Sequence, residues 1–403
     1  MRFALRTCSK SSERRVSQGE IRKESGVGTE PTRIFWGIST QAHPSLAARK
    51  RVLGLVALAA SLTACHSEPP RTEQESYVFG TRVVITVVGT PAPQARTAIA
   101  EALAELDQLH ARLHPWQAAG SEVVALNAAL AAGQAAPVSP VLAELIAASQ
   151  HAEALSDGYF NPAIGQLVAL WGFHADSFTP RQPNAARLAT LLARQPSMAA
   201  VVVTEGHARS RNPAVALDLG GIAKGWALDR VAQRLRQQGI QTALINIGGN
   251  VLALGAPEGR AWKVGIQHPR AAEAMAVVSL ADGEAIGTSG DYQRYFEWQG
   301  TRYCHLIDPH TGRADCPRQA ATVLVERGEA AGLRSDTATK ALFFAPTDRV
   351  ATYADRFKVR AVLRLEADGH AEISPYMATR LTWLKPPAVV TPLPHFPSPK
   401  TAP

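Results

Sequence analysis

Long apolar runs and net charge on the main part of the chain are both scarce in this sequence of 403 residues. The apolar run at residues 52–62 is about half the length of a permanent transmembrane helix, which needs about 20 residues. The formal net charge is +8, but residues 1–64 hold 11 Lys/Arg against 4 Asp/Glu, and the rest of the chain holds 31 against 30. The basic charge therefore belongs to the N-terminal extension, and the sequence argues against a nucleic-acid-binding protein.

The sequence also lacks a GxGxxG motif and a P-loop, so ordinary Rossmann or Walker chemistry does not follow. It has instead the glycine-rich stretch DLGGIAKG at residues 218–225, after a segment of strand composition at 214–219. An amphipathic helix is expected next, with Gly239 placed to end it. A glycine turn at a helix start, with Lys224 in the first turn, is typical of a phosphate or pyrophosphate site. The alternative is a tight strand-to-helix turn that holds no ligand.

The N-terminal region resembles an export signal. Arg49, Lys50 and Arg51 precede the apolar run, and Leu62-Thr63-Ala64-Cys65 resembles a bacterial lipobox in which Cys65 would carry the lipid. Residues 49–65 are therefore predicted to be a lipoprotein signal peptide, and residues 66–76 a polar tether. Residues 1–48, upstream of that signal, are interpreted as a disordered leader or a mis-assigned start.

Cysteine is also scarce, with four residues in the chain. Cys8 lies in the leader and Cys65 at the lipid site. Cys304 and Cys316, twelve residues apart, could form a disulfide in an oxidising compartment or remain as two buried thiols, and the sequence leaves both open.

Strand and helix patterns mix along the chain without strict alternation, which predicts an α+β (mixed α/β) fold. Strand-like segments are expected at residues 77–88, 198–203, 242–254, 263–267, 276–280, 284–289, 322–325, 359–365 and 371–374, with a hairpin at 292–307. Helices are expected at residues 95–113, 140–156, 184–194, 223–237, 332–343 and 347–356. The proline-rich segment 381–403 is predicted to be a disordered tail.

Several polar clusters accompany the glycine-rich stretch. Residues 246–249 read NIGG, residues 288–294 read TSGDYQR, residues 305–313 read HLIDPHTGR, and residues 335–340 read SDTATK at a helix start. Each cluster alone is typical of ordinary structure. Together they indicate phosphate binding, a carboxylate for a divalent metal and a histidine that moves a proton.

With these clusters in this order, the chain resembles the ApbE family of FAD:protein FMN transferases over residues 77–380. The resemblance implies mixed sheets flanked by helices, FAD as substrate and Mg²⁺ as cofactor. It also implies cleavage of the FAD pyrophosphate, transfer of FMN to a threonine or serine hydroxyl of an acceptor flavoprotein, and release of AMP. The acceptor would belong to a membrane-bound redox system. The protein would be periplasmic and lipid-anchored; the inner membrane is favoured over the outer, and the sequence leaves that choice open.

The resemblance also implies roles for individual residues. His305 would be the catalytic base. The FAD contacts would be Phe79, Tyr159, Phe160, Asn161, Asp218, Lys224, Gly248 and Gly249, together with His305. The metal ligands would be the carbonyl of Ala223, the carboxylate of Asp336 and the hydroxyl of Thr339.

One position departs from the family pattern. The family usually has threonine four residues after the metal-binding aspartate, and Lys340 stands there in this chain. Either Thr339 takes the ligand role, or the ammonium of Lys340 occupies the space of the cation. Two other functions therefore stay open: an FAD pyrophosphatase that gives FMN and AMP, and a periplasmic FAD-binding protein without turnover.

Overall fold

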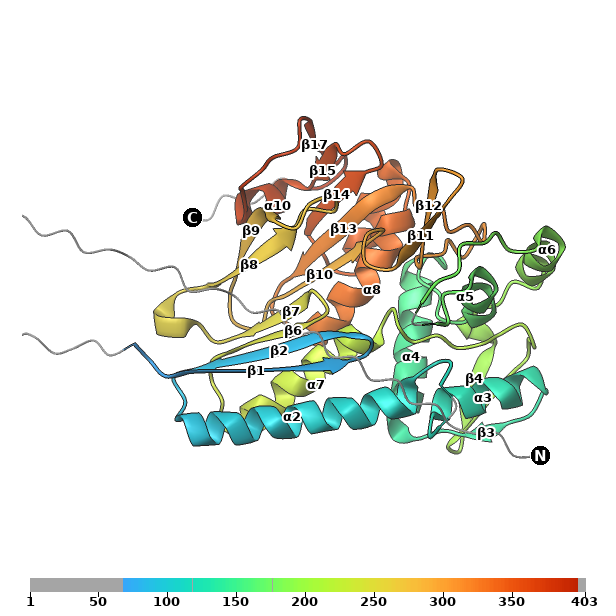
Figure 1. Cartoon of the computed structure of the whole chain (residues 1–403), viewed down its shortest axis with the longest axis horizontal. Helices are drawn as coiled ribbons and strands as arrows, with labels where there is room; N and C mark the ends of the chain where they lie inside the picture. The colour runs from blue at the N-terminus through green and yellow to red at the C-terminus, as the bar shows by residue number, and fades with distance from the viewer. Residues whose placement is uncertain (1–67, 118, 176, 398–403) are drawn as a thin grey trace, which may run out of the picture. The chain divides into compact units, whose positions relative to one another are not determined.

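The computed structural model describes residues 68–117, 119–175 and 177–397, so the predictions for the leader, the signal peptide and Cys65 lie outside the described residues. From Glu68 onward the chain forms a single unit. It is built on a nine-stranded sheet with the order β1-β2-β6-β7-β10-β13-β14-β15-β17 (Figure 1). Neighbouring strands pair antiparallel, apart from the parallel pair of β15 and β17.

The strands of the large sheet are β1 (Arg71–Val78), β2 (Thr81–Val88), β6 (Ala243–Ile247), β7 (Asn250–Leu254), β10 (Ala285–Gly290), β13 (Arg318–Val325), β14 (Ala361–Glu366), β15 (Ala371–Ile373) and β17 (Val390–Pro392). Three smaller sheets hold β3 (Ala136–Pro137), β4 (Val201–Thr204), β5 (His207–Ser210), β8 (Trp262–Gln267), β9 (Ala274–Leu280), β11 (Tyr295–Trp298), β12 (Thr301–Cys304) and β16 (Leu381–Trp383).

The helices are α2 (Ala92–Leu113), α3 (Glu122–Ala131), α4 (Pro140–Leu155), α5 (Gly165–Trp171), α6 (Ala185–Ala193), α7 (Ala223–Gln237), α8 (Ala331–Phe344), α9 (Val350–Arg356) and α10 (Pro375–Arg380). Short 3₁₀ turns are η1 (Met198–Ala200), η2 (Pro257–Gly259) and η3 (Thr347–Arg349).

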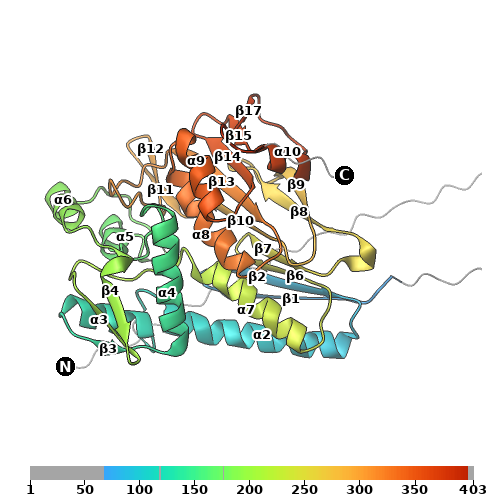
Figure 2. The same ribbon diagram turned by 180° about the vertical axis from the view of Figure 1, so that it is seen from behind.

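Helices α2, α7 and α8 cover one face of the large sheet (Figure 2). Helix α2 buries Ile99, Leu106 and Leu113, which recur every seven residues on one side, as an amphipathic helix on a core requires. These side chains join the largest apolar cluster, together with inward residues of β2 and β6 such as Ile85 and Ile245.

The opposite face is covered by the three-stranded sheet β16-β9-β8 and by α10. A second apolar cluster lies there, formed by residues such as Met275, Val278, Leu324 and Met377. Strand β13 is buried at all of its positions because it is covered on both faces. A third cluster packs α5 against the hairpin β11–β12, which brings the segment that follows β12 toward α5.

The predicted α+β fold of mixed sheets with flanking helices is confirmed. Three local expectations are corrected. Residues 71–76, predicted as part of a polar tether at 66–76, lie in β1 and pair with β2. Residues 214–219 are not a strand: Ala216 makes one bridge to Ile164, and the N–H of Asp218 donates to the carbonyl of Pro162.

The third correction concerns the C-terminal segment. Residues 381–397 are not an unstructured tail, because β16 pairs with β9, β17 pairs with β15, and the side chain of Leu393 is 3% exposed. Within the described ranges, no helix is both long enough and apolar enough to cross a membrane.

Candidate functional site

Two tight hairpin turns meet at one end of the large sheet. Phe79 and Gly80 connect β1 to β2 with φ of 55° and 66°, and Gly248 and Gly249 connect β6 to β7 with φ of 61° and 91°. Because β2 and β6 are neighbours, the turns touch: a Cβ on Gly248 would lie 2.7 Å from Oγ1 of Thr81. Positive φ is uncommon for a bulky side chain, and such strained positions cluster at functional sites. This places the predicted contacts Phe79, Gly248 and Gly249 together.

The glycine-rich stretch forms a compact turn held by its own polar groups. One oxygen of Asp218 accepts the N–H of Gly220 at 2.9 Å, and the other lies 3.0 Å from Nε2 of His174. Burial opposes ionisation of Asp218, but the contacts with His174, the N–H of Gly220 and the charge of Arg294 together outweigh burial and lower the pKa of the carboxyl. The ammonium of Lys224 donates to the carbonyl of Gly220 at 2.8 Å. The glycine turn thus contacts both an ionised carboxylate and a lysine ammonium.

Helices α7 and α8 cap each other with carboxylates. Asp336 of α8 accepts the N–H of Gly225, in the first turn of α7, at 2.9 Å. Asp229 of α7 accepts the N–H groups of Gly332 and Leu333, at the start of α8, both at 2.8 Å. Each carboxylate meets the positive end of the other helix dipole. Burial raises the pKa of Asp229 to about 6.

Lys340 and Asp336 form a buried ion pair one turn apart on α8. The ammonium of Lys340 donates to Oδ1 of Asp336 and, at 2.8 Å, to the main-chain carbonyl of Asp336. Burial alone would raise the pKa of Asp336, but the charges of Lys340 and Lys224 outweigh burial and hold that pKa below its usual value. Burial lowers the pKa of Lys340 to about 8, against the opposing attraction of Asp336.

The hydroxyl of Thr339 is engaged away from that pair. Its Oγ1 donates to the carbonyl of Asp336 at 2.7 Å and lies 2.8 Å from Oγ of Ser289 on β10. The side chain is fully buried between α8 and the sheet. The third predicted metal ligand, Ala223, is the first residue of α7 and is 5% exposed.

His305 follows β12 and is oriented by the main chain of Arg294. The main-chain nitrogen and the ring Nδ1 of His305 lie 3.0 and 3.2 Å from the carbonyl oxygen of Arg294. Because that carbonyl only accepts, neutral His305 carries its proton on Nδ1 and presents the lone pair on Nε2. Burial, followed by the charges of Arg294, Lys224 and Lys340, lowers the pKa of His305 to about 3. The ring is therefore neutral at physiological pH, as a general base must be.

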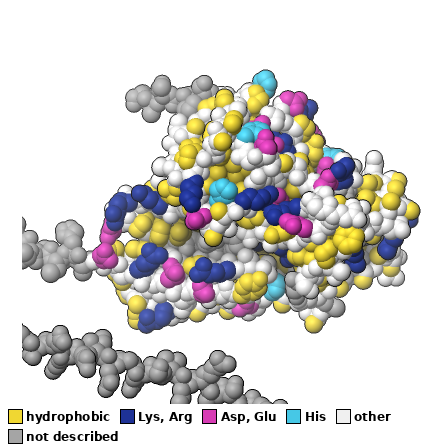
Figure 3. All heavy atoms as spheres, turned by 45° about the horizontal axis from the view of Figure 1, so that its top comes forward, with side chains coloured by type: hydrophobic (Ala, Val, Ile, Leu, Met, Phe, Trp, Pro, Cys, Tyr) yellow, Lys and Arg dark blue, Asp and Glu magenta, His cyan; other side chains and the backbone are white. Residues whose placement is uncertain are grey.

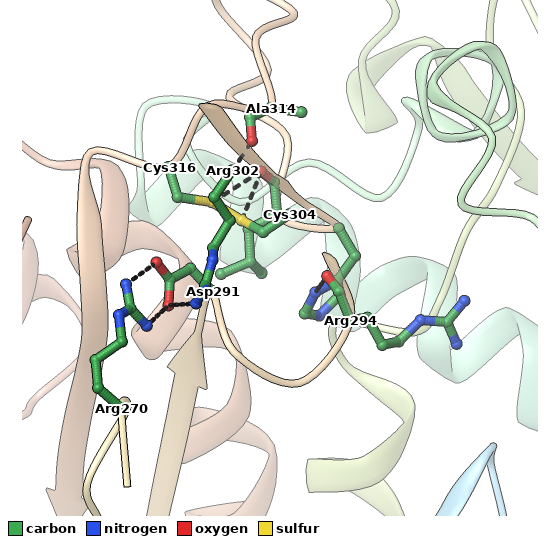
Figure 4. The surroundings of a disulfide bond; sticks show 9 residues. Arg270, Asp291, Arg294, Arg302, Cys304, Ala314 and Cys316 are labelled. Carbon is green, nitrogen blue, oxygen red and sulfur yellow. Dashed lines mark hydrogen bonds and ion pairs between the residues drawn. A yellow bond between two sulfur atoms is a disulfide. The ribbon is translucent and has the colours of Figure 1, made fainter. Parts of the chain in front are cut away.

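The segment around His305 is fixed by a disulfide between Cys304 and Cys316. This resolves the alternative that the sequence left open. Figure 4 shows Asp291 held between Arg270 and Arg302 on one side of the disulfide, while the side chain of Arg294 extends away from it. The carboxylate of Asp291 accepts hydrogen bonds from both terminal nitrogens of Arg270, at 2.7 and 2.6 Å.

The three predicted contacts at residues 159–161 differ in their surroundings. Phe160 is buried, with Cε2 3.3 Å from where a Cβ on Gly221 would be, so its ring packs against the glycine turn. Tyr159 is half-buried and packs edge-on to His310. Asn161 uses both ends of its amide on the main chain, donating to Pro196 and accepting from Ala163. Its side chain holds a loop in place.

Sequence reasoning missed a row of rings beside Asp218. Trp116 stacks on His174 with ring centroids 5.1 Å apart, and the guanidinium of Arg294 lies 5.6 Å from the Trp116 ring. These residues come from three distant segments. The signal in the sequence was weak: Trp116 and His174 stand in irregular stretches after helices, and Arg294 lay inside a cluster without an assigned role.

The structure therefore brings together Lys224, Asp336 and Lys340, whose charges shift the pKa values of Asp336 and Lys340. The charges of both lysines also lower the pKa of His305. Arg294 links this group to the hairpin turns, since its Nη1 is 3.9 Å from where a Cβ on Gly80 would be. Figure 3 shows lysine and arginine side chains in a band across the middle of one face, with acidic side chains among them. Cationic side chains gathered in this way suit a phosphate-bearing ligand.

The comparisons with known proteins agree with this arrangement. The model of the ApbE family matches residues 79–363, and the chain belongs to that family. The FAD:protein FMN transferase of Rhodobacter capsulatus is 40% identical over 328 residues, which cover 81% of this chain and 61% of that protein. A protein of the same name from Klebsiella pneumoniae is 40% identical over 197 residues, 48% of this chain and 60% of its own length. The chain thus spans about 60% of the length of these two curated relatives.

Solved structures give the same result. The ApbE protein of Thermotoga maritima matches with a TM-score of 0.70 at 26% identity, over 77% of this chain and 99% of that one. The flavinyl transferase ApbE of Pseudomonas stutzeri, in its apo form, matches with a TM-score of 0.64 at 29% identity, over 75% and 93% of the two chains. The family resemblance drawn from the sequence motifs is confirmed.

Proposed function

We propose that this protein transfers FMN from FAD to a threonine or serine hydroxyl of an acceptor flavoprotein and releases AMP. The observation that carries this proposal is the meeting of Lys224, Lys340 and neutral His305 beside one glycine turn. The names of the curated relatives, which are FAD:protein FMN transferases, support the same reaction.

The transfer is a displacement at phosphorus. The acceptor hydroxyl oxygen forms a bond to the phosphorus of the FMN half, and the bond from that phosphorus to the bridging oxygen breaks. AMP leaves with the electron pair of the broken bond. Nε2 of His305 accepts the hydroxyl proton, and the two ammonium groups bind the non-bridging oxygens, on which negative charge accumulates. The atoms balance without an oxidant or a reductant.

The decisive experiment is mass spectrometry of a candidate acceptor after incubation with FAD and this protein. The expected result is a mass increase of one FMN on a single threonine or serine, with AMP released in equal amount. Acceptor without added mass would overturn the proposal. AMP and free FMN formed without any acceptor would identify the pyrophosphatase, because water then replaces the hydroxyl.

A non-catalytic FAD-binding protein is the second candidate, and the Lys340–Asp336 ion pair is the observation that favours it. If the lysine served only to hold a bound diphosphate, FAD would remain intact in the protein. Tight retention of FAD without AMP, in the presence of acceptor and of Mg²⁺, would establish this second candidate.

We further propose that Cys65 carries a lipid that anchors the protein to the periplasmic face of the inner membrane, where a membrane-bound redox partner would supply the acceptor. The basic residues and short apolar run before Cys65 support this proposal. Metabolic labelling with a fatty acid should label the wild-type protein and leave Cys65→Ser unlabelled. Label on the variant would place the lipid elsewhere.

A further inference from the structure

Asp336 is a buried carboxylate whose charge is compensated entirely by this chain. It is 0% exposed, and an isolated ionised carboxylate in such a place would be strongly destabilising. Its Oδ2 accepts the N–H of Gly225 at the positive end of α7, and its Oδ1 accepts from the ammonium of Lys340. Both oxygens therefore already have positive partners.

The residues around Asp336 do not fit a resident Mg²⁺. Magnesium requires about six oxygen ligands in octahedral geometry, and a carboxylate oxygen that faces it directly. The ammonium of Lys340 stands at Oδ1, and the hydroxyl of Thr339 is committed to the main chain of α8 and to Ser289. A dication beside that ammonium would meet strong repulsion at close range.

The ammonium of Lys340 lies where a bound diphosphate could meet it. Its stem passes the glycine turn, with Cε 3.6 Å from where a Cβ on Gly221 would be. The side chain is 14% exposed, whereas that of Asp336 is fully buried, so the lysine forms the outer member of the pair. Two of its three N–H groups go to Asp336. The third suits a phosphate oxygen, because lysine binds phosphate as a compact point charge.

We propose that Lys340 is a covalently attached cation that takes the place of a divalent metal, so that this chain binds and cleaves FAD without Mg²⁺. The inference rests on the proposed function, since the diphosphate it concerns is that of FAD. In the transfer step Lys340 remains protonated and donates to a non-bridging oxygen, while the bonds at phosphorus change as described above. Asp336 positions the ammonium and contacts no reacting atom.

The test compares FAD affinity with excess EDTA and with millimolar Mg²⁺, by quenching of flavin fluorescence, in the wild-type protein. The two dissociation constants should agree within about twofold, because EDTA cannot remove the ammonium of Lys340 from the protein. Titration with Mn²⁺ followed by electron paramagnetic resonance should show no ion bound to the wild type. A loss of affinity of about tenfold or more in EDTA, or saturable Mn²⁺ binding by the FAD complex, would overturn the inference.

Lys340→Thr supplies the complementary measurement. This variant should bind Mn²⁺ in the presence of FAD. Its FAD affinity in EDTA should fall by about 10- to 100-fold, because one charge-assisted hydrogen bond is lost, and the affinity should recover with Mg²⁺. Lys385→Thr, at an exposed surface lysine, is the matched control and should behave as the wild type. A Lys340→Thr protein that folds yet gains no Mn²⁺ would refute the idea that the lysine stands in the place of a metal.

These readouts separate the inference from the proposed function. If no acceptor gains FMN under any condition, the transferase proposal fails, while the binding constants and the Mn²⁺ titration still decide the role of Lys340. If Lys340→Thr does not fold, the wild-type measurements decide alone. Lys340→Met, which keeps the stem, should bind FAD weakly in both EDTA and Mg²⁺.

Discussion

The chemistry of this protein depends at the scale of single residues on which groups are charged. Burial, followed by the positive charges of Arg294, Lys224 and Lys340, lowers the pKa of His305 and keeps its ring neutral. Asp336 is held ionised by those same lysines. A neutral histidine near two ammonium groups suits the transfer that we propose, in which a proton is removed close to a diphosphate.

Replacement of His305 by alanine should separate binding from transfer. The variant lacks Nε2 but keeps the lysines, so FAD affinity should stay within about threefold, whereas the transfer rate should fall by about 10²- to 10⁴-fold, the usual contribution of a general base. Isothermal titration with FAD and single-turnover formation of flavinylated acceptor measure the two quantities. Normal transfer by the variant would show that the base lies elsewhere.

The depressed pKa of His305 should also appear in the pH dependence of stability. The folded pKa, about 3, lies below the ordinary value of 6.5, so the stabilisation is present above about pH 6.5 and is lost as the pH falls toward 3. Between pH 7 and pH 5 the wild type should lose about 1–2 kcal/mol more free energy of unfolding than His305→Asn, which does not titrate. Urea denaturation at the two pH values measures the difference, and parallel losses would contradict the shift.

At the scale of elements, the site depends on how closely α7 and α8 approach. A Cβ on Gly225 would lie 2.4 Å from the carbonyl oxygen of Gly332 and 2.5 Å from Cβ of Asp336. The two helices can cap each other with Asp336 and Asp229 because neither glycine has a side chain at the crossing. The position of Asp336, and with it that of Lys340, is thus a result of helix packing.

Gly225→Ala should therefore push the helices apart. Overpacking of this kind costs about 1–3 kcal/mol of folding free energy, which outweighs the gain in helix propensity of about 1 kcal/mol from alanine. Thermal unfolding should show a lower midpoint, and FAD affinity should fall because Lys340 moves. Gly328→Ala is the control, since its nearest neighbour is the tip of a flexible arginine at 3.5 Å. Equal stability of the two variants would mean that α7 and α8 tolerate separation.

At the scale of the whole molecule, one large sheet and the helices on it carry most parts of the site. Its helical face supplies Lys224, Asp336 and Lys340 from α7 and α8, and two of its hairpin turns supply Phe79 and Gly248. The hairpin β11–β12 packs on α5 and leads into His305. The C-terminal segment completes the sheet through β17, so it belongs to the folded unit.

Leu393 tests that last point. Its side chain is 3% exposed against the core, whereas that of Leu384 is 56% exposed. Leu393→Ala should destabilise the protein by about 2–4 kcal/mol, the range for a buried leucine, while Leu384→Ala should change stability by less than about 0.5 kcal/mol. Chemical denaturation measures both. Equal and small effects would mean that the segment after β16 is not part of the core.

The amino-acid sequence by itself determined the helices and strands with a clear period, because burial of one face imposes a repeat that residues such as Ile99 and Leu106 display locally. It also determined the family, since the motifs DLGGIAKG, NIGG and HLIDPHTGR are contiguous in the chain. Segments without a period, such as 214–219 and 381–392, were misjudged because their pairing depends on distant partners.

Only the tertiary structure showed that Lys340 forms a buried ion pair with Asp336. The spacing of four residues puts Lys340 and Asp336 on one side of a helix, yet a lysine so placed can equally extend into solvent. The neighbours of the pair in other segments include Gly221 and Gly225, which lie more than a hundred residues away in the sequence. Burial makes the carboxylate take the nearest cation, and burial is set by contacts between segments that no local pattern records.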